Sequence, residues 1–157
     1  ARSKLPVFFV VQDNKYAISV PVSDQTAGGS AFKLARGYEG LSRINANGTD
    51  FFEMYAVTKA ATEHIRAGKG PVCLVAHVVR LLPHPSSDNH AKYRSPEELE
   101  ADKQLDPILQ LEARMSEAGI LDEKRIASTR EEIAHAVDQA ALWADSQADT
   151  VIKASAH

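Results

Sequence analysis

The sequence has one cysteine, one tryptophan and two methionines among its 157 residues, and it has no long apolar run. Because Cys73 is the only cysteine, we expect no intrachain disulfide, and its place inside the apolar stretch 71–79 predicts a buried thiol, not a reactive one. No stretch approaches the roughly 20 apolar residues that a membrane-spanning helix needs. The apolar stretch 5–11 is also too short for a secretory signal. These absences favour a reducing compartment and predict no membrane partner.

An excess of charge of one sign is missing as well. The formal net charge is -3, and the charged residues, 25% of the total, carry both signs interspersed along the chain. No basic stripe is available to neutralise a phosphate backbone, so we expect no nucleic acid partner. The 44% of hydrophobic residues are typical of a globular domain. The chain starts with Ala1, not methionine, and enters an apolar stretch almost at once, which suggests a piece of a longer protein.

Two short apolar runs, one on either side of a helical pattern, predict the fold class. Residues 6–11 and 71–79 have the composition of strands that are buried on both faces. Residues 50–68 open with a capping box and continue with apolar side chains at helical spacing. A shorter helix is predicted over 30–36, and 40–48 reads as irregular or extended. The order of strand, helix and strand predicts an α/β fold with a parallel sheet.

Residues 80–94 form an uninterrupted polar loop with two prolines, two serines and two histidines. A loop of this length in a compact domain is either functional or disordered. Beyond this loop, capping motifs predict three helices, which begin near Ser95, Asp106 and Ser128. We therefore predict a part of an α/β domain over 1–95, which includes the loop, and a helical segment over 96–157.

Three stretches of the sequence carry a family resemblance that spans nearly the whole chain. The first is Val-Val-Gln-Asp-Asn-Lys-Tyr-Ala-Ile-Ser-Val-Pro at 10–21, the second covers 47–71, and the third runs from Arg80 to Glu98. Together they resemble the C-terminal portion of the alpha subunit of the thiamine diphosphate-dependent decarboxylating component of 2-oxo acid dehydrogenase complexes. Pyruvate, branched-chain and acetoin enzymes belong to this group, and in some members the alpha part is fused to a beta part. The resemblance implies a thiamine diphosphate-binding domain of parallel-sheet type.

The resemblance implies half of a magnesium and thiamine diphosphate site at 12–16. It assigns the side-chain oxygen of Asn14 and the main-chain carbonyl of Tyr16 to the metal, which suits the preference of Mg²⁺ for oxygen ligands. Gln12 stands where some members have an arginine that helps to hold the diphosphate, and Asp13 replaces the first asparagine of the usual pair. The acidic ligand belongs to a Gly-Asp-Gly motif that these residues do not contain. From the residues alone, Asn14 also reads as an ordinary turn asparagine and Tyr16 as a packing residue.

The loop supplies the remaining site residues. By resemblance, His84 is catalytic: it reaches the diphosphate and helps to receive the lipoyl group, a role that suits an imidazole near neutral pH. A solvated loop histidine is the alternative. The resemblance also implies that four residues hold the loop in order around the cofactor, although Asp88 alone can also be read as shaping a turn. These loop-ordering residues are Arg80, Asp88, Tyr93 and Arg94.

Three other positions allow simpler predictions. Pro85 stands where mitochondrial relatives carry a phosphorylated serine, so control by a kinase at this position is excluded. His77 lies within the second apolar run, and we expect it to be buried and hydrogen-bonded. The charge run 97–103 is predicted to be a solvated helix face.

The resemblance implies an enzyme that decarboxylates a 2-oxo acid on thiamine diphosphate and transfers the acyl group to a lipoyl arm. The expected partners are a beta subunit or beta domain, which supplies the activating glutamate, and the lipoyl-bearing acyltransferase component. The chain would then be inactive alone and part of a heterotetramer or of a dimer of fused chains, in the cytoplasm or in the mitochondrial matrix. Whether the substrate is pyruvate or a branched-chain acid stays open. The alternative is a non-catalytic assembly module that docks a beta subunit through its C-terminal helices.

Overall fold

The computed structural model of the protein describes residues 2–147, so residue 1 and residues 148–157 lie outside the described part. The chain separates into two units, Ala1–Ala113 and Arg114–His157. The predicted boundary at 95/96 falls inside the first unit. The assignment of 1–95 to cofactor binding and of 96–157 to a separate helical segment stays a prediction.

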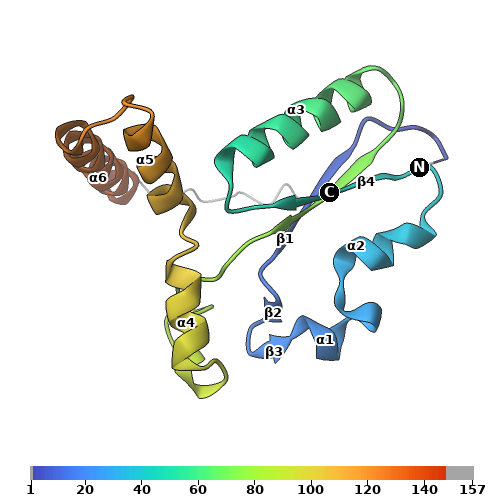
Figure 1. Cartoon of the computed structure of the whole chain (residues 1–157), viewed down its shortest axis with the longest axis horizontal. Helices are drawn as coiled ribbons and strands as arrows, with labels where there is room; N and C mark the ends of the chain where they lie inside the picture. Colours follow the sequence, from blue (N-terminus) through green and yellow to red (C-terminus); the bar gives the residue numbers. More distant parts are fainter. Residues whose placement is uncertain (1, 148–157) are drawn as a thin grey trace, which may run out of the picture. The chain divides into compact units, whose positions relative to one another are not determined.

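A three-stranded parallel sheet organises the first unit (Figure 1). The central strand β5 (Val72–His77) pairs with β1 (Phe8–Asp13) on one side and with β4 (Ser42–Asn47) on the other. In this register Asp13 and Asn47 both lie opposite His77, so the three strands end at the same level. The predicted α/β class and parallel sheet are therefore confirmed.

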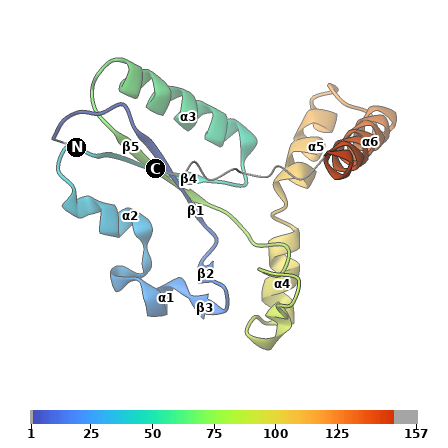
Figure 2. The same cartoon turned by 180° about the vertical axis from the view of Figure 1, so that it is seen from behind.

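Helices cover both faces of the sheet. The long helix α3 (Phe51–Arg66) connects β4 to β5 on one face, and the short helices α2 (Ala31–Leu34) and η2 (Ala35–Gly37) lie on the other (Figures 1 and 2). The second face holds a core cluster of Ala35, Cys73 and Val75. Burial raises the pKa of the Cys73 thiol, as expected for a packed cysteine and not for a reactive one.

The start of α3 is held by the side chains that the sequence predicts. Asp50 accepts hydrogen bonds from the main-chain N–H groups of Phe52 and Glu53, while Glu53 reaches back to the N–H of Asn47 at 3.0 Å. Between strand and helix lies Gly48, whose N–H donates to the His77 carbonyl at 2.7 Å. A Cβ at this position would lie 2.8 Å from that carbonyl oxygen and 2.5 Å from the Val78 side chain, so only glycine fits.

The strands differ from the prediction in detail. The stretch 40–48, predicted to be irregular or extended, contains the regular strand β4, and Ser-Arg-Ile-Asn-Ala-Asn has too little apolar character to predict a buried strand. The first strand begins two residues later than predicted and is not buried on both faces, since Phe9 and Val10 are 51% and 53% exposed. Among the described residues β1 pairs only with β5, so its other edge is open.

A tight hairpin follows β1. It consists of β2 (Tyr16–Ala17) and β3 (Val20–Pro21), and it leads into α1 (Val22–Gln25) and η1 (Ala27–Gly29). Lys15 and Ile18 have φ angles of 68° and 57°. Both are in the left-handed region, which non-glycine residues occupy only when their surroundings hold them there.

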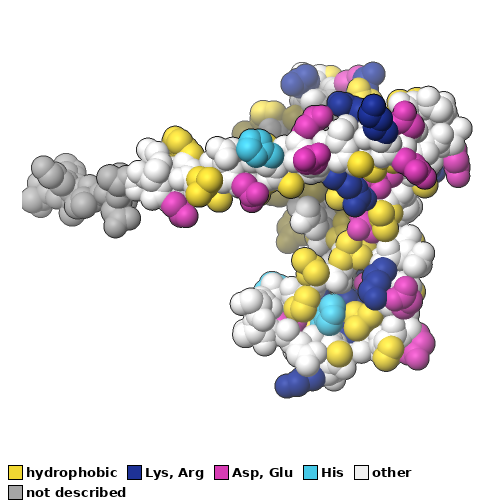
Figure 3. Space-filling model, turned by 90° about the vertical axis from the view of Figure 1, so that its left-hand side faces the viewer, with side chains coloured by type: hydrophobic (Ala, Val, Ile, Leu, Met, Phe, Trp, Pro, Cys, Tyr) yellow, Lys and Arg dark blue, Asp and Glu magenta, His cyan; other side chains and the backbone are white. Residues whose placement is uncertain are grey.

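The predicted C-terminal helices are all present among the described residues. After the turn η3 (His90–Lys92) come α4 (Pro96–Lys103), α5 (Pro107–Glu117) and α6 (Glu123–Ser146). The last helix begins five residues before the predicted start at Ser128, because Asp122 caps it by accepting from the N–H of Arg125 at 2.7 Å. Hydrophobic side chains lie exposed along α6 (Figure 3), among them Ile133, Val137, Leu142 and Trp143. No helix within 2–147 is both long and apolar enough to cross a membrane.

Candidate functional site

The carboxyl ends of parallel strands are where α/β sheets usually bind ligands. At the end of β1 a pocket of about 140 Å³ opens beside the turn that leads into the hairpin. The residues of this turn, 12–17, line it together with Val11, Val22, Gln25 and Ala31. Three of the four predicted cofactor residues, Gln12, Asn14 and Tyr16, therefore share one pocket, whereas the fourth, His84, is not among its lining residues.

The turn offers two oxygen atoms of the kind that magnesium prefers. Asn14 Oδ1 accepts the N–H of Tyr16 at 3.0 Å, so the ordinary turn role of this asparagine is real, and the oxygen keeps a second lone pair. Across the hairpin the N–H of Val22 donates to the Lys15 carbonyl at 2.8 Å, so Tyr16 and its partner Pro21 form a non-hydrogen-bonded pair, in which the main-chain groups point away from the partner strand. Both oxygens thus suit a bound cation. Within 2–147 no group of three or more His, Cys, Asp or Glu side chains could hold a metal.

A strand-end cluster of Asp13, Lys15, Asn45 and His77 links the ends of all three strands. Lys15 Nζ donates to Asp13 Oδ2 at 2.5 Å and to His77 Nδ1 at 2.8 Å. His77 Nε2 lies 2.7 Å from Asn45 Oδ1. The prediction that His77 is hydrogen-bonded is correct, but its side chain is 35% exposed and so is not buried.

Asp13 is the buried carboxylate of this cluster. Burial by itself raises the pKa of the carboxyl, but the hydrogen bonds and charge of Lys15 outweigh it and hold the pKa below its ordinary value. The main-chain N–H of Lys15 adds a bond to Asp13 Oδ1 at 3.1 Å. The carboxylate is therefore charged at neutral pH and ties Lys15 down through both its backbone and its side chain.

On the other side of the turn, an arginine cluster of Tyr16, Arg80, Tyr93 and Arg94 connects the hairpin to the loop 80–94. Arg80 Nη1 donates to the Ile18 carbonyl at 2.6 Å, and Nη2 lies 2.5 Å from the Tyr93 hydroxyl. Its guanidinium stands 5.3 Å from the centre of the Tyr16 ring and 5.6 Å from that of Tyr93, in the range of cation–π attraction. Arg80 thus holds Ile18, the hairpin residue with a positive φ.

Arg94 closes the loop and is only 4% exposed. Its guanidinium donates to Glu98 Oε1 at 2.7 Å, to the Arg80 carbonyl at 2.9 Å and to a carboxylate oxygen of Asp102. Tyr16 in turn donates its hydroxyl to Glu98 at 3.0 Å. Glu98 and Asp102 are therefore structural partners, and the prediction of a solvated face over 97–103 is wrong for these two. Glu98 and Asp102 lie four and eight residues after Arg94, and this spacing of opposite charges could have predicted the two contacts.

Asp88 joins the middle of the loop to this cluster. Its Oδ2 accepts from the Tyr93 hydroxyl at 2.6 Å and from the N–H of His84 at 3.1 Å. The hydrogen bond from Tyr93 lowers the pKa of the Asp88 carboxyl. Arg80, Asp88, Tyr93 and Arg94 are all connected by these bonds, but their role in ordering the loop around a cofactor stays a prediction. The His84 side chain is exposed.

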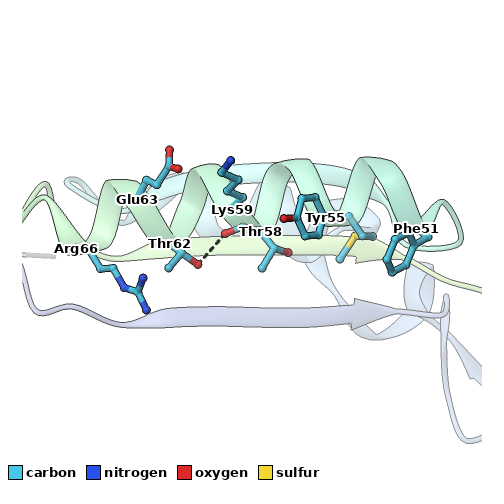
Figure 4. A pocket seen from close by; sticks show the side chains of 8 residues that line it. Phe51, Tyr55, Thr58, Lys59, Thr62, Glu63 and Arg66 are labelled. Atoms are coloured by element: carbon cyan, nitrogen blue, oxygen red, sulfur yellow. Dashed lines mark hydrogen bonds between the residues drawn. The ribbon is translucent and has the colours of Figure 1, made fainter.

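A larger groove of about 540 Å³ contains none of the predicted site residues. It runs along α3 (Figure 4) and is lined by Phe51, Met54, Tyr55, Thr58, Lys59, Thr62, Glu63 and Arg66. Thr62 turns its hydroxyl back to the Thr58 carbonyl at 2.8 Å. All of its lining residues come from this one helix and none is a predicted site residue, so we place the candidate site in the smaller pocket.

Comparison with known proteins identifies the family of this chain. The family profile described as "Dehydrogenase E1 component" matches residues 1–153. The 2-oxoisovalerate dehydrogenase subunit alpha of Bacillus subtilis (strain 168) is 39% identical over 137 residues, which cover 87% of this chain and 41% of that protein. The 3-methyl-2-oxobutanoate dehydrogenase subunit alpha of Mycobacterium tuberculosis (strain CDC 1551 / Oshkosh) is 40% identical over 119 residues, 76% of this chain and 32% of its own length.

A pyruvate dehydrogenase E1 component subunit alpha is similar as well. The protein from Bacillus subtilis (strain 168) is 32% identical over 145 residues, 92% of this chain and 39% of the relative. The chain thus spans between 32% and 41% of the length of these three relatives. The matched residues include the pocket, the loop and most of the helices that follow. The chain therefore belongs to the dehydrogenase E1 component family, among its alpha subunits.

Proposed function

We propose that this chain provides half of a magnesium and thiamine diphosphate site in a 2-oxo acid dehydrogenase. The observation that carries the proposal is the pocket at the end of β1, where Asn14 Oδ1 and the Tyr16 carbonyl flank Lys15 and have lone pairs available. When bound, the cofactor supplies the electron sink for decarboxylation, while the protein positions it. Asn14 and Tyr16 would hold the metal, and Gln12 would donate its amide N–H to the diphosphate.

His84 is the residue of the loop with chemistry to offer. It is exposed, and its backbone is fixed by the bond of its N–H to Asp88, which leaves the imidazole available to a partner. We propose that it donates to the diphosphate and helps to receive the lipoyl arm of the acyltransferase component. The beta subunit would complete the site with the acidic group that activates the cofactor. We place the enzyme in the cytoplasm, with the mitochondrial matrix as the alternative.

The metal role of Asn14 can be tested in the complete enzyme that contains this chain. Replacing Asn14 with alanine removes one oxygen ligand, so we expect the affinity for Mn²⁺, measured by electron paramagnetic resonance in the presence of thiamine diphosphate, to fall on the order of tenfold or more. Asn89→Ala is the matched control, because Asn89 also accepts a main-chain N–H two residues ahead, from Ala91 at 3.2 Å. Equal Mn²⁺ affinities of the two variants would exclude Asn14 as a ligand.

The proposed role of His84 predicts different losses in two partial reactions. His84→Ala should reduce reductive acylation of a lipoyl domain by at least tenfold, while decarboxylation measured with an artificial electron acceptor should fall much less. His135→Ala, at an exposed position of α6, serves as the control. Equal losses in both partial reactions would contradict a role of His84 toward the lipoyl group.

The second candidate function is a non-catalytic assembly module. The exposed apolar side chains of α6, including Val137 and Trp143, favour a protein partner. Such a module needs neither Asn14 nor His84. The two functions are separated by the Asn14→Ala variant, because an assembly module would keep its binding to a beta subunit and would show no Mn²⁺ affinity to lose.

A further inference from the structure

The strand-end cluster lies directly beside the proposed metal ligands. Lys15 is the single residue between Asn14 and Tyr16, so its backbone angles set how the Asn14 side chain and the Tyr16 carbonyl are directed. That backbone is in the left-handed region, with φ of 68°. A lysine persists in this conformation only when its surroundings hold it there.

Four hydrogen bonds hold Lys15 in place, and the one that reaches farthest along the sequence is to His77. The main-chain carbonyl of Lys15 accepts from the N–H of Val22 at 2.8 Å. Asp13 binds both the main-chain N–H and the ammonium of Lys15. The ammonium also donates to His77 Nδ1, 62 residues away in the sequence. Because an ammonium has no lone pair, Nδ1 must be the acceptor, so Nε2 carries the proton and donates to Asn45 Oδ1. The hydrogen bonds thus run in one direction, from the turn across β5 to β4.

We infer that His77 and Asn45 are positioning residues: through Lys15 they fix the turn so that the Asn14 side-chain oxygen and the Tyr16 carbonyl face the same cation. The inference rests on the proposed function. Neither residue touches the metal. They act as the outer groups around metal sites do, by fixing the orientation of the ligands. Register supports the inference, because His77 lies opposite Asp13, the last residue of β1.

Two substitutions of His77 distinguish positioning from a general effect on the sheet. His77→Leu keeps a side chain of similar bulk but removes both hydrogen bonds. In the complete enzyme we expect Mn²⁺ affinity in the presence of thiamine diphosphate to fall roughly tenfold. His77→Gln keeps one acceptor for Lys15 and one donor for Asn45, so it should restore most of the affinity. His135→Leu, on the exposed surface of α6, is the control.

A second measurement needs no metal and uses the full chain. The N–H groups of Lys15 and Tyr16 are bonded to side-chain oxygens of Asp13 and Asn14, so their hydrogen exchange reports on the turn. We expect His77→Leu to speed their exchange several-fold, with no change for the N–H groups at the centre of β5. His77→Gln should return the exchange rates toward those of the original chain.

The outcomes separate this inference from the proposed function. Unchanged Mn²⁺ affinity and exchange in His77→Leu would overturn the positioning role. So would a loss of affinity that accompanies a lower unfolding temperature and is not restored by His77→Gln, because that result indicates a role in sheet stability alone. If Asn14→Ala binds Mn²⁺ normally, the proposed metal site itself is wrong. Weak binding by Asn14→Ala with normal binding by His77→Leu removes only the inference.

Discussion

The turn 12–17 and Ile18, the residue after it, are held from two sides by clusters of different construction. The arginine cluster uses guanidinium groups that bind several oxygens each and stack on tyrosine rings, and it extends to α4 through Glu98 and Asp102. The strand-end cluster is smaller: one lysine binds one carboxylate and one imidazole, which themselves lie 3.4 Å apart, and one amide follows. Removing an arginine that binds several oxygens should therefore cost more stability than removing a member of the strand-end cluster.

The largest loss of stability should come from replacing Arg94, because Glu98, Asp102 and the Arg80 carbonyl all accept hydrogen bonds from this one side chain. Arg94→Ala leaves Glu98 and Asp102 without a cation, and we expect the free energy of unfolding to fall by about 2–3 kcal/mol, less than for a fully enclosed pair because both carboxylates keep contact with water. Urea denaturation of the chain measures this loss. Arg125→Ala is the control, since Arg125 and Glu132 form an exposed pair at 3.4 Å that should contribute under about 0.5 kcal/mol. Similar losses in the two variants would remove the distinction between the clusters.

A smaller effect, with a pH dependence, is expected from Asp13. The pKa of its carboxyl is lower in the folded chain than in the unfolded one. The charged form therefore stabilises the fold above the unfolded pKa, near 4, and this stabilisation is lost as the pH falls through the folded pKa. Asp13→Asn should lower the free energy of unfolding at pH 7 by about 1–2 kcal/mol.

The pH profile tests the same variant. Below about pH 4 the difference between Asp13→Asn and the original chain should shrink, and it should be smallest below the lowered folded pKa of Asp13, where both chains carry a neutral side chain. Asp138→Asn, an exposed position on α6, should show no such convergence. A constant difference between pH 3 and pH 7 would show that the charge of Asp13 does not stabilise the turn.

The smallest effect concerns Tyr16, a member of the arginine cluster that directly follows Lys15 of the strand-end cluster in the sequence. Tyr16→Phe removes the hydrogen bond to Glu98 but keeps the ring between the two arginines, so we expect a loss of about 0.5–1 kcal/mol. Mn²⁺ affinity should be unchanged, because the proposed ligand is the main-chain carbonyl. Tyr55→Phe, whose side chain is exposed on α3, is the control for stability. A fall in Mn²⁺ affinity for Tyr16→Phe would mean that the side chain helps to place the metal.

The sequence predicts the features that depend on local pattern. The apolar run at 71–79 became the buried strand β5, and the capping box at Asp50 became the start of α3. The start of α6 was missed, because two capping signals compete and Asp122 comes before Ser128. The stretch that holds β4 was predicted only as irregular or extended, because this strand depends on pairing with β5 and not on its own composition.

The contents of the site could be predicted only in part. Gln12, Asn14 and Tyr16 lie within five residues of one another, so any turn would bring them together. The link between Arg80 and Tyr93 came from the family resemblance, since no spacing rule brings residues 13 apart in a loop into contact. The contact of Lys15 with His77 crosses 62 residues and depends on strand register, which the sequence does not contain in readable form.

Gly48 has a consequence for how this sequence can evolve. A side chain there would displace the His77 carbonyl, so the space beside β4 and the position of the strand-end cluster are a single constraint. A substitution at position 48 would therefore also disturb the strand-end cluster, whose residues lie outside the loop 80–94. When distant homologues are compared, a glycine at this position is a sign that the rim of the sheet has kept its geometry. Any other residue at this position requires the end of β5 to shift.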